Sequence, residues 1–265
     1  MTIAQTNIDE LKDRYLAGES AADLGKDLGF SGETVRRWLR PLGVMRKKSE
    51  TARKLLTKYS QREDAFNIAR ATPDMAYWAG WLCADGSVRT GKAVAMSLAR
   101  RDIEILKQLK IWSNFTGPIS SQIKNGNKEY ARIIVFSQQW IHSLADWGVV
   151  PRKTYNGSNL TQVMKLDCFP LFFRGLFEGD GCIHVAKSGK PYLSASGRPE
   201  VIDHLRCWMW NVDRNPGSLN RRSLYLHVVQ FGGQSAVRAA KRLYDGSYPE
   251  LALHRKKKLI DTIIK

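Results

Sequence analysis

Two aspartates, Asp85 and Asp180, end two apolar segments that share the same spacing of small residues. The first segment reads WAGWLCADG over 78–86, and the second reads FRGLFEGDG over 173–181. Each segment has two small residues four positions apart, which places them on one helix face and allows a second helix to approach closely. If the segments pack along these faces, the two carboxylates become neighbours. Such a pair needs protons or cations, and a divalent metal ion is the simplest partner.

Each acid would lie at the C-terminal end of its helix, where the helix dipole is negative and disfavours a carboxylate. Gly86 and Gly181 follow the acids and are expected to cap both helices in the left-handed conformation. The alternative is a pair of buried core helices without chemistry. The repetition of the whole pattern favours a shared site over that alternative.

The two segments resemble the nine-residue motif of the LAGLIDADG homing endonucleases, which cut DNA at long sites. In that family the motif occurs twice in a monomer, and the last acid of each copy binds metal and is catalytic. The resemblance implies that Asp85 and Asp180 are catalytic metal ligands, with Ala84 and Gly179 in the metal site. It also implies Mg²⁺ as the cofactor, with Mn²⁺ as a substitute. Cys83 departs from the family pattern, where an acid is common but not essential.

The chain has 265 residues and a formal net charge of +17, which indicates a polyanionic partner, with nucleic acid before an acidic membrane. An apolar content of 43% supports a folded protein, and no apolar run is long enough for a membrane span. No secretory signal is visible at the N-terminus, and the cysteines form no CxxC pair. A cytoplasmic location, in a bacterial or phage-infected cell, is therefore expected, and zinc is not implied.

Each motif is followed by the same order of predicted elements. In the first half these are strands at 87–90 and 92–98, a helix after Asp102, a hairpin turning at 125–127 and a helix over 138–147. In the second half they are strands around a KSGKP turn, a helix from 199, a hairpin turning at 220–223 and a helix over 234–244. The expected fold is α+β, with two pseudo-twofold αββαββα repeats over about 73–160 and 161–265. In the family, such strands form a saddle over DNA.

The sheet faces and the ends of the two halves supply further candidates. Both halves end in an Arg-Lys pair, and the family's cleavage centre implies that Lys153 and Lys256 orient water or neutralise charge. Polar side chains on a two-stranded ribbon suit readout of the major groove, although a solvated sheet face is the common alternative. The residues expected to contact DNA are Gln122, Lys124, Arg132, His184, Lys187, Tyr192, Ser194, Arg221, Arg222, Tyr225 and His227.

Residues 7–44 are predicted to form three short helices, with Ser20 and Ser31 as N-caps of the second and third. The last two resemble a helix-turn-helix of the resolvase/invertase kind, in which the third helix enters the major groove. A small bundle used for protein contact is the alternative. The expected DNA contacts are Ser31, Glu33, Thr34, Arg36, Arg37 and Arg40.

The predicted domains are a helix-turn-helix domain at 1–45, a basic linker at 46–72 and a LAGLIDADG endonuclease domain at 73–265. Arg46, Lys47 and Lys48 in the linker could follow phosphates, or the run could simply be solvated. The leading hypothesis is a monomeric, metal-dependent endonuclease that cuts double-stranded DNA at a loosely palindromic site. The alternatives are a non-cleaving transcriptional regulator and a splicing helper that binds intron RNA.

Overall fold

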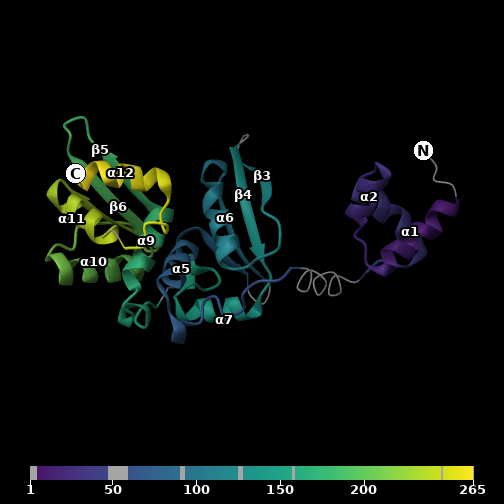
Figure 1. Cartoon of the computed structure of the whole chain (residues 1–265), viewed down its shortest axis with the longest axis horizontal. Coiled ribbons are helices and arrows are strands. Elements are labelled where there is room, and N and C mark those ends of the chain that lie inside the picture. Colours follow the sequence, from purple (N-terminus) through teal and green to yellow (C-terminus); the bar gives the residue numbers. More distant parts are fainter. Residues whose placement is uncertain are drawn as a thin grey trace. The chain divides into compact units, whose positions relative to one another are not determined.

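A computed structural model describes residues 5–46, 59–89, 93–124, 128–156, 159–245 and 247–264 (Figure 1). The chain divides into two compact units, residues 1–57 and 58–265. No helix in these described ranges is both long enough and apolar enough to cross a membrane.

The first unit is a bundle of three helices, α1 (Gln5–Ala17), α2 (Ala21–Leu28) and α3 (Gly32–Leu39), followed by the 3-10 turn η1 (Arg40–Leu42). The predicted N-caps are confirmed, since Ser20 Oγ accepts from the Asp23 amide and Ser31 Oγ accepts from the Thr34 amide, both at 3.1 Å. The helices enclose a small separate core of Leu11, Tyr15, Ala21, Leu24, Val35 and Leu39.

The second unit contains two repeats of one element order. The first repeat consists of α5 (Pro73–Asp85), β1 (Gly86–Arg89), β2 (Ala93–Ala99), the 3-10 turn η3 (Arg100–Asp102), α6 (Ile103–Trp112), β3 (Ser120–Lys124), β4 (Lys128–Val135), α7 (Gln138–Asp146) and the short α8 (Lys153–Asn156). The second consists of η4 (Val163–Lys165), α9 (Phe169–Asp180), β5 (Gly181–Val185), β6 (Pro191–Gly197), α10 (Pro199–Asp213), β7 (Ser218–Ser223), β8 (Leu226–Gly232), α11 (Gln234–Leu243) and α12 (His254–Ile264).

Each repeat forms a four-stranded antiparallel sheet, with the order β1-β2-β4-β3 in the first and β5-β6-β8-β7 in the second. The predicted α+β class and its two repeats are therefore confirmed. Burial alternates along β1 and along most of β4, and each sheet has one face against its helices and one more open face. The buried faces carry Val88, Val94, Met96, Ala131 and Ile133 in the first sheet and Ile183, Leu193, Ala195, Val229 and Phe231 in the second.

The motif helices α5 and α9 lie between the two sheets and pack directly against each other (Figure 1). A Cβ added to Gly80 would lie 2.0 Å from the Phe172 carbonyl oxygen, and one added to Gly175 would lie 2.1 Å from the Tyr77 carbonyl oxygen. The two backbones are therefore in contact at these positions, as the small-residue spacing predicted. Large aromatic side chains on the other faces of both helices anchor them in the core.

The segment at 59–72 differs from the linker that the sequence indicated. Phe66 is fully buried, and the indole nitrogens of Trp140 and Trp147 donate to the carbonyl oxygens of Arg62 and Phe66 at 2.7 and 2.9 Å. The 3-10 turn η2 (Ile68–Arg70) then leads into α5. The charged composition of this segment is typical of a solvated linker, but a few aromatic contacts attach it to the second unit.

The turn of the second hairpin is also displaced from its predicted position at 220–223. Strand β7 continues through Ser223 with a bulge between Arg221 and Ser223, and the turn falls at Leu224 and Tyr225. The polar run NRRS is typical of a turn, but it lies in an exposed strand at the edge of the sheet. Leu224 and Tyr225 therefore lie in the turn, and strand β8 (Leu226–Gly232) begins after them.

Candidate active site

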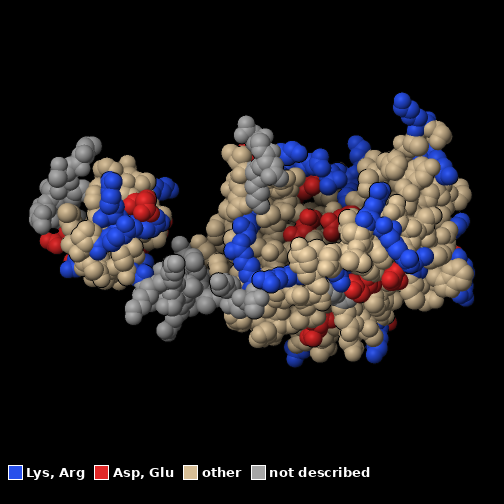
Figure 2. Space-filling view, turned by 180° about the vertical axis from the view of Figure 1, so that it is seen from behind, with Lys and Arg blue, Asp and Glu red and all other residues tan. Residues whose placement is uncertain are grey.

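The C-terminal ends of α5 and α9, which carry Asp85 and Asp180, lie next to each other. Asp85 Oδ2 would lie 3.0 Å from a Cβ placed on Gly179, the residue immediately before Asp180. Asp85 is half-buried, and Asp180 is exposed. Figure 2 shows acidic surface at the centre of a hollow in the second unit, with Lys and Arg surface around it. Asp85 thus lies beside the end of the helix that carries Asp180, near enough for the charge of Asp180 to act on its carboxylate.

The glycines that follow the acids do not have the expected left-handed conformation. Gly86 and Gly181 have φ values of −75° and −90°, and the chain passes directly from each helix into a strand. A Cβ on either residue would lie 2.3 Å from a carbonyl oxygen of its own helix, that of Leu82 or Phe177. These glycines are therefore required for a close turn over the helix end and not for a positive φ.

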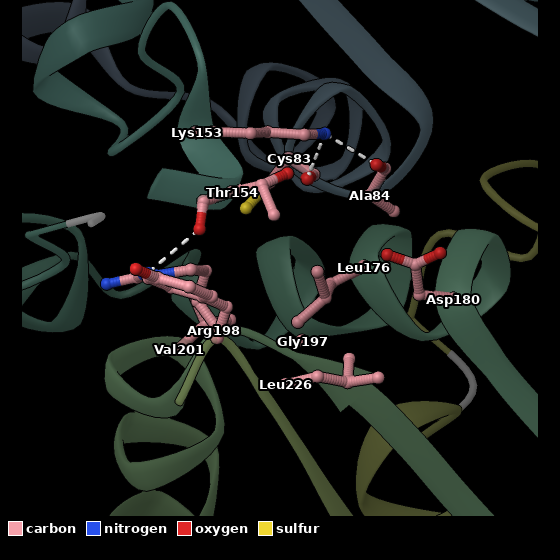
Figure 3. A pocket seen from close by; sticks show the side chains of 11 residues that line it. Cys83, Ala84, Lys153, Thr154, Leu176, Asp180, Gly197, Arg198, Val201 and Leu226 are labelled. Carbon is pink, nitrogen blue, oxygen red and sulfur yellow. Dashed lines mark hydrogen bonds between the residues drawn. The ribbon is translucent and has the colours of Figure 1, made fainter. Parts of the chain in front are cut away.

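Two lysines bind the C-terminal ends of the motif helices, where carbonyl oxygens are left without intrahelical partners. Lys153 Nζ donates to the Leu82 oxygen at 3.0 Å and also to those of Cys83 and Ala84 (Figure 3). Lys256 Nζ donates to the Phe177 oxygen at 2.9 Å and to the Gly181 oxygen at 2.6 Å. Positive charge there offsets the helix dipole and the neighbouring carboxylate. The lysines predicted from the sequence thus occupy corresponding positions in the two repeats.

Burial raises the pKa values of both acids, and repulsion between the two carboxylates adds to the shift of Asp85. Burial, and then the charge of Asp180, raise the pKa of Asp85 from 3.8 to about 6, although Lys153 and Lys256 oppose the shift. The pKa of Asp180 is also raised. Its side chain is partly accessible to solvent, but the protein around the carboxylate removes enough water to disfavour the charged form. Burial lowers the pKa of Lys153, and burial together with Arg255 lowers that of Lys256 to about 8. The site therefore holds two carboxylates that would be stabilised by an added cation.

The donor set suits a hard divalent cation. Two carboxylates and the adjacent Gly179 carbonyl present oxygen ligands only, and Mg²⁺ needs few protein ligands because it keeps several waters. The carbonyl oxygen of Ala84, the other backbone member of the predicted metal set, accepts from Lys153. Within the described residues, no three His, Cys, Asp or Glu side chains gather into a metal-binding group. Any ion held here would therefore rely on the two aspartates, backbone oxygens, water and substrate.

A buried network beside the site was not anticipated from the sequence. Glu178, the counterpart of Cys83 in the second motif, accepts from the hydroxyls of Tyr77 and Tyr244 at 2.6 and 2.9 Å and from the Leu253 amide at 2.8 Å. It ties the first motif to the second and to the turn that precedes α12. A glutamate within a strongly apolar helix was the available signal, because such a group needs buried partners.

Two of the predicted DNA contacts of the first sheet, Gln122 and Arg132, lie on its open face. Gln122 is opposite Tyr130, and Arg132 is opposite Ser97 and Ser120. Lys124 is opposite Lys128 at the end of the same hairpin. The Arg132 Nε has no hydrogen-bond partner in the described part of the chain. This Nε is buried, so Arg132 combines an unpaired buried nitrogen with a side chain that lies on the open face.

The predicted contacts of the second sheet divide between its faces. His184 stacks on Tyr192 with ring centroids 5.0 Å apart, and Ser194 shares their open face. Lys187 and Arg222 are also exposed. By register, His227 and its strand partner Arg221 share the face of Val229, which is fully buried, although Arg221 itself is exposed and His227 is half-buried. The open face instead includes Cys182, Ser196, Ser218, Asn220, Val228 and Gln230.

Tyr225 likewise differs from the predicted strand position. It lies in the β7–β8 turn and packs against Tyr155, with ring centroids 5.4 Å apart, while the Arg198 guanidinium lies 5.5 Å from its ring. Together with Lys153 and Asp180, it lines a cavity of about 150 Å³ beside the acids. Its position indicates a role in joining the two repeats.

In the first unit, Ser31, Thr34 and Arg37 lie on one side of α3, and Glu33 forms an ion pair with Arg36 at 2.5 Å. Arg40 is 3.6 Å from the same glutamate. The negative charge of Glu33 therefore partly neutralises Arg36 and Arg40, two of the cationic side chains expected to contact DNA.

Arg46, which the sequence placed in the basic linker, packs against the helices of the first unit. Its guanidinium lies 4.0 Å from the centre of the Tyr15 ring and donates to the carbonyl oxygens of Tyr15 and Glu19. It therefore closes the helical bundle on itself. Lys47 and Lys48 lie outside the described residues.

Comparison with known proteins identifies similar solved structures. No protein-family model matches the chain, and no curated protein matches it. The LAGLIDADG meganuclease I-AabMI bound to uncleaved DNA has a TM-score of 0.48 and 15% identity, with 73% of this chain and 89% of that chain covered. The LAGLIDADG homing endonuclease I-LtrWI bound to target DNA has a TM-score of 0.46 and 11% identity, with 76% and 90% covered. I-SmaMI bound to cleaved DNA has a TM-score of 0.46 and 14% identity, with 72% and 87% covered. The chain is similar to these LAGLIDADG homing endonucleases, and at such identities and TM-scores the similarity alone assigns it neither a substrate nor a reaction.

Proposed function

We propose that this chain is a site-specific endonuclease that hydrolyses both strands of double-stranded DNA with a divalent metal ion. The observation that carries the proposal is that Asp85 lies beside the end of the helix that carries Asp180, within reach of its charge. A single chain supplies both acids, so a monomer suffices. The net charge of +17 supports a polyanionic substrate.

The acids and lysines have complementary roles in this proposal. Asp85 and Asp180, with the Gly179 carbonyl, would hold Mg²⁺, with Mn²⁺ as a substitute, and the bound metal would stabilise charge on the scissile phosphate and lower the pKa of an attacking water. The carboxylates must be deprotonated to bind the cation, which favours pH values above the Asp85 pKa of about 6. Lys153 and Lys256 hold the helix ends in place and add positive charge beside the phosphates.

The open sheet faces would read the target. Gln122 and Arg132 in the first repeat and His184, Tyr192 and Ser194 in the second present donors and acceptors of the kind that distinguish base pairs in the major groove. Because the two sheets differ in sequence, the two half-sites would differ as well. The helix-turn-helix unit would extend the site through Ser31, Thr34 and Arg37 at the start of α3. Activity on DNA is consistent with the cytoplasmic location expected from the sequence.

The test is incubation of the full chain with a plasmid library of randomised sites in Mg²⁺. Discrete double-strand cuts are expected, and EDTA, Asp85→Asn or Asp180→Asn should abolish them while binding persists. Asp203→Asn, the same change in an exposed ion pair on α10, is the matched control and should cut normally. Tight binding of a defined site without cleavage in Mg²⁺ or Mn²⁺ would instead establish a DNA-binding regulator.

A further inference from the structure

The lysine of the second repeat is connected to the first repeat through its neighbour in the chain. Arg255, immediately before Lys256, donates from Nε and Nη2 to the two carboxylate oxygens of Asp102, at 2.8 and 2.9 Å. Asp102 ends the 3-10 turn between β2 and α6, and it is only 8% exposed. A two-bond guanidinium–carboxylate pair fixes orientation as well as distance. The N-terminus of α12 is therefore held by the opposite repeat.

The lysine of the first repeat is connected in the corresponding way. Thr154, immediately after Lys153, accepts at its carbonyl oxygen from Arg198 Nη1 at 2.8 Å (Figure 3). Arg198 lies between β6 and α10, the same junction in the second repeat that Asp102 occupies in the first. Glu200 holds the guanidinium with two hydrogen bonds, at 2.7 and 3.1 Å, and the Tyr225 ring lies beside it.

These contacts limit the freedom of two otherwise flexible side chains. A lysine ammonium at the end of four methylenes has many rotamers, so its position depends on the backbone that carries it. Lys153 and Lys256 each bind the motif helix of their own repeat, while the adjacent residue is anchored to the other repeat. Loss of an anchor would release one lysine and leave the other in place.

We propose that Asp102 and Arg198 are positioning residues for the two cleavage centres. Asp102, through Arg255, sets the position of Lys256, and Arg198, through the Thr154 backbone, sets that of Lys153. Each residue therefore governs hydrolysis of one DNA strand. This inference rests on the proposed endonuclease function.

The test uses a cleavable duplex with a different label on each strand, cut by the full chain in Mg²⁺. Asp102→Asn should slow one strand by on the order of tenfold or more and accumulate nicked duplex, since small displacements of a catalytic group are costly. Arg198→Gln should slow the opposite strand. Asp102→Glu should recover much of the lost rate, and Thr154→Ala, which keeps the backbone carbonyl, should behave as wild type.

Amide hydrogen exchange, measured without metal or DNA, tests the contacts of Asp102 and Arg198 independently of cleavage. Asp102→Asn should increase amide hydrogen exchange at the start of α12 and leave α8 unchanged, and Arg198→Gln should do the reverse. Equal slowing of both strands by either variant, or unchanged exchange at both helices, would overturn the positioning role while the endonuclease function stands. A wild-type chain that cuts neither strand would overturn both proposals.

Discussion

Replacing Gly80 with alanine should force the two motif helices apart. The new Cβ would lie 2.0 Å from the Phe172 carbonyl oxygen and 2.9 Å from the Leu176 amide nitrogen, both of them backbone atoms. Real Cβ contacts are essentially never shorter than 3.0 Å, so α5 and α9 must separate by about 1 Å there. Overpacking of this kind costs about 1–3 kcal/mol. For a unit of this size, that corresponds to a fall in Tm of roughly 2–12 °C.

The same displacement should reach Asp85, one and a half turns further along α5. A shift of about 1 Å at a catalytic group can cost on the order of 100-fold in rate. Thermal unfolding and cleavage of a labelled duplex measure the two effects. Gly197→Ala is the matched control, because its Cβ would meet only Ile202 and Val201 at ordinary distances of 3.6–3.8 Å. If Gly80→Ala melts and cuts as the control does, the close helix contact does not position the acids.

The acids and the first unit give further predictions. Asp85→Asn should stabilise the metal-free protein at pH 7, because the folded-state pKa of about 6 exceeds the unfolded value of 3.8 and stability is lost as pH rises between them. The gain is at most about 3 kcal/mol and should vanish near pH 4; a lower Tm at pH 7 would contradict it. Mg²⁺ should raise the Tm of the wild type but not of Asp85→Asn/Asp180→Asn, and equal shifts in calorimetry would place the ion elsewhere. Deleting residues 1–45 should shorten the DNA footprint and weaken binding but spare cleavage, and loss of all cleavage would contradict an independent module.

The repeats could be predicted from the sequence because their signals are local and occur twice. The small residues at Gly80 and Gly175 indicated a close helix contact, and the acids at fixed distances beyond them indicated a shared site. The Arg-Lys pairs drew attention to Lys153 and Lys256 for the same reason. Hydrophobic periodicity and helix caps involve residues that are close in the sequence, so they can be recognised without knowledge of the fold.

The remaining features depend on contacts between residues that are distant in the chain. Asp102 and Arg255 form their pair across 153 positions, and no local pattern connects them. The turn at Leu224 and Tyr225 was missed because neither residue type is typical of a turn; Leu224 is exposed, and Tyr225 packs against Tyr155 of the first repeat. The exposure of β8 could not be predicted from residue type, because the apolar Leu226 is exposed while the polar His227 is half-buried.

The central claim is that carboxylates from the two motif helices form one cation-binding centre. Anomalous diffraction from crystals grown with Mn²⁺ and a target duplex tests it most directly. We expect manganese density in contact with oxygens of both Asp85 and Asp180 and beside the scissile phosphates. Manganese bound elsewhere on the chain, with both carboxylates contacted only by lysine or water, would contradict it.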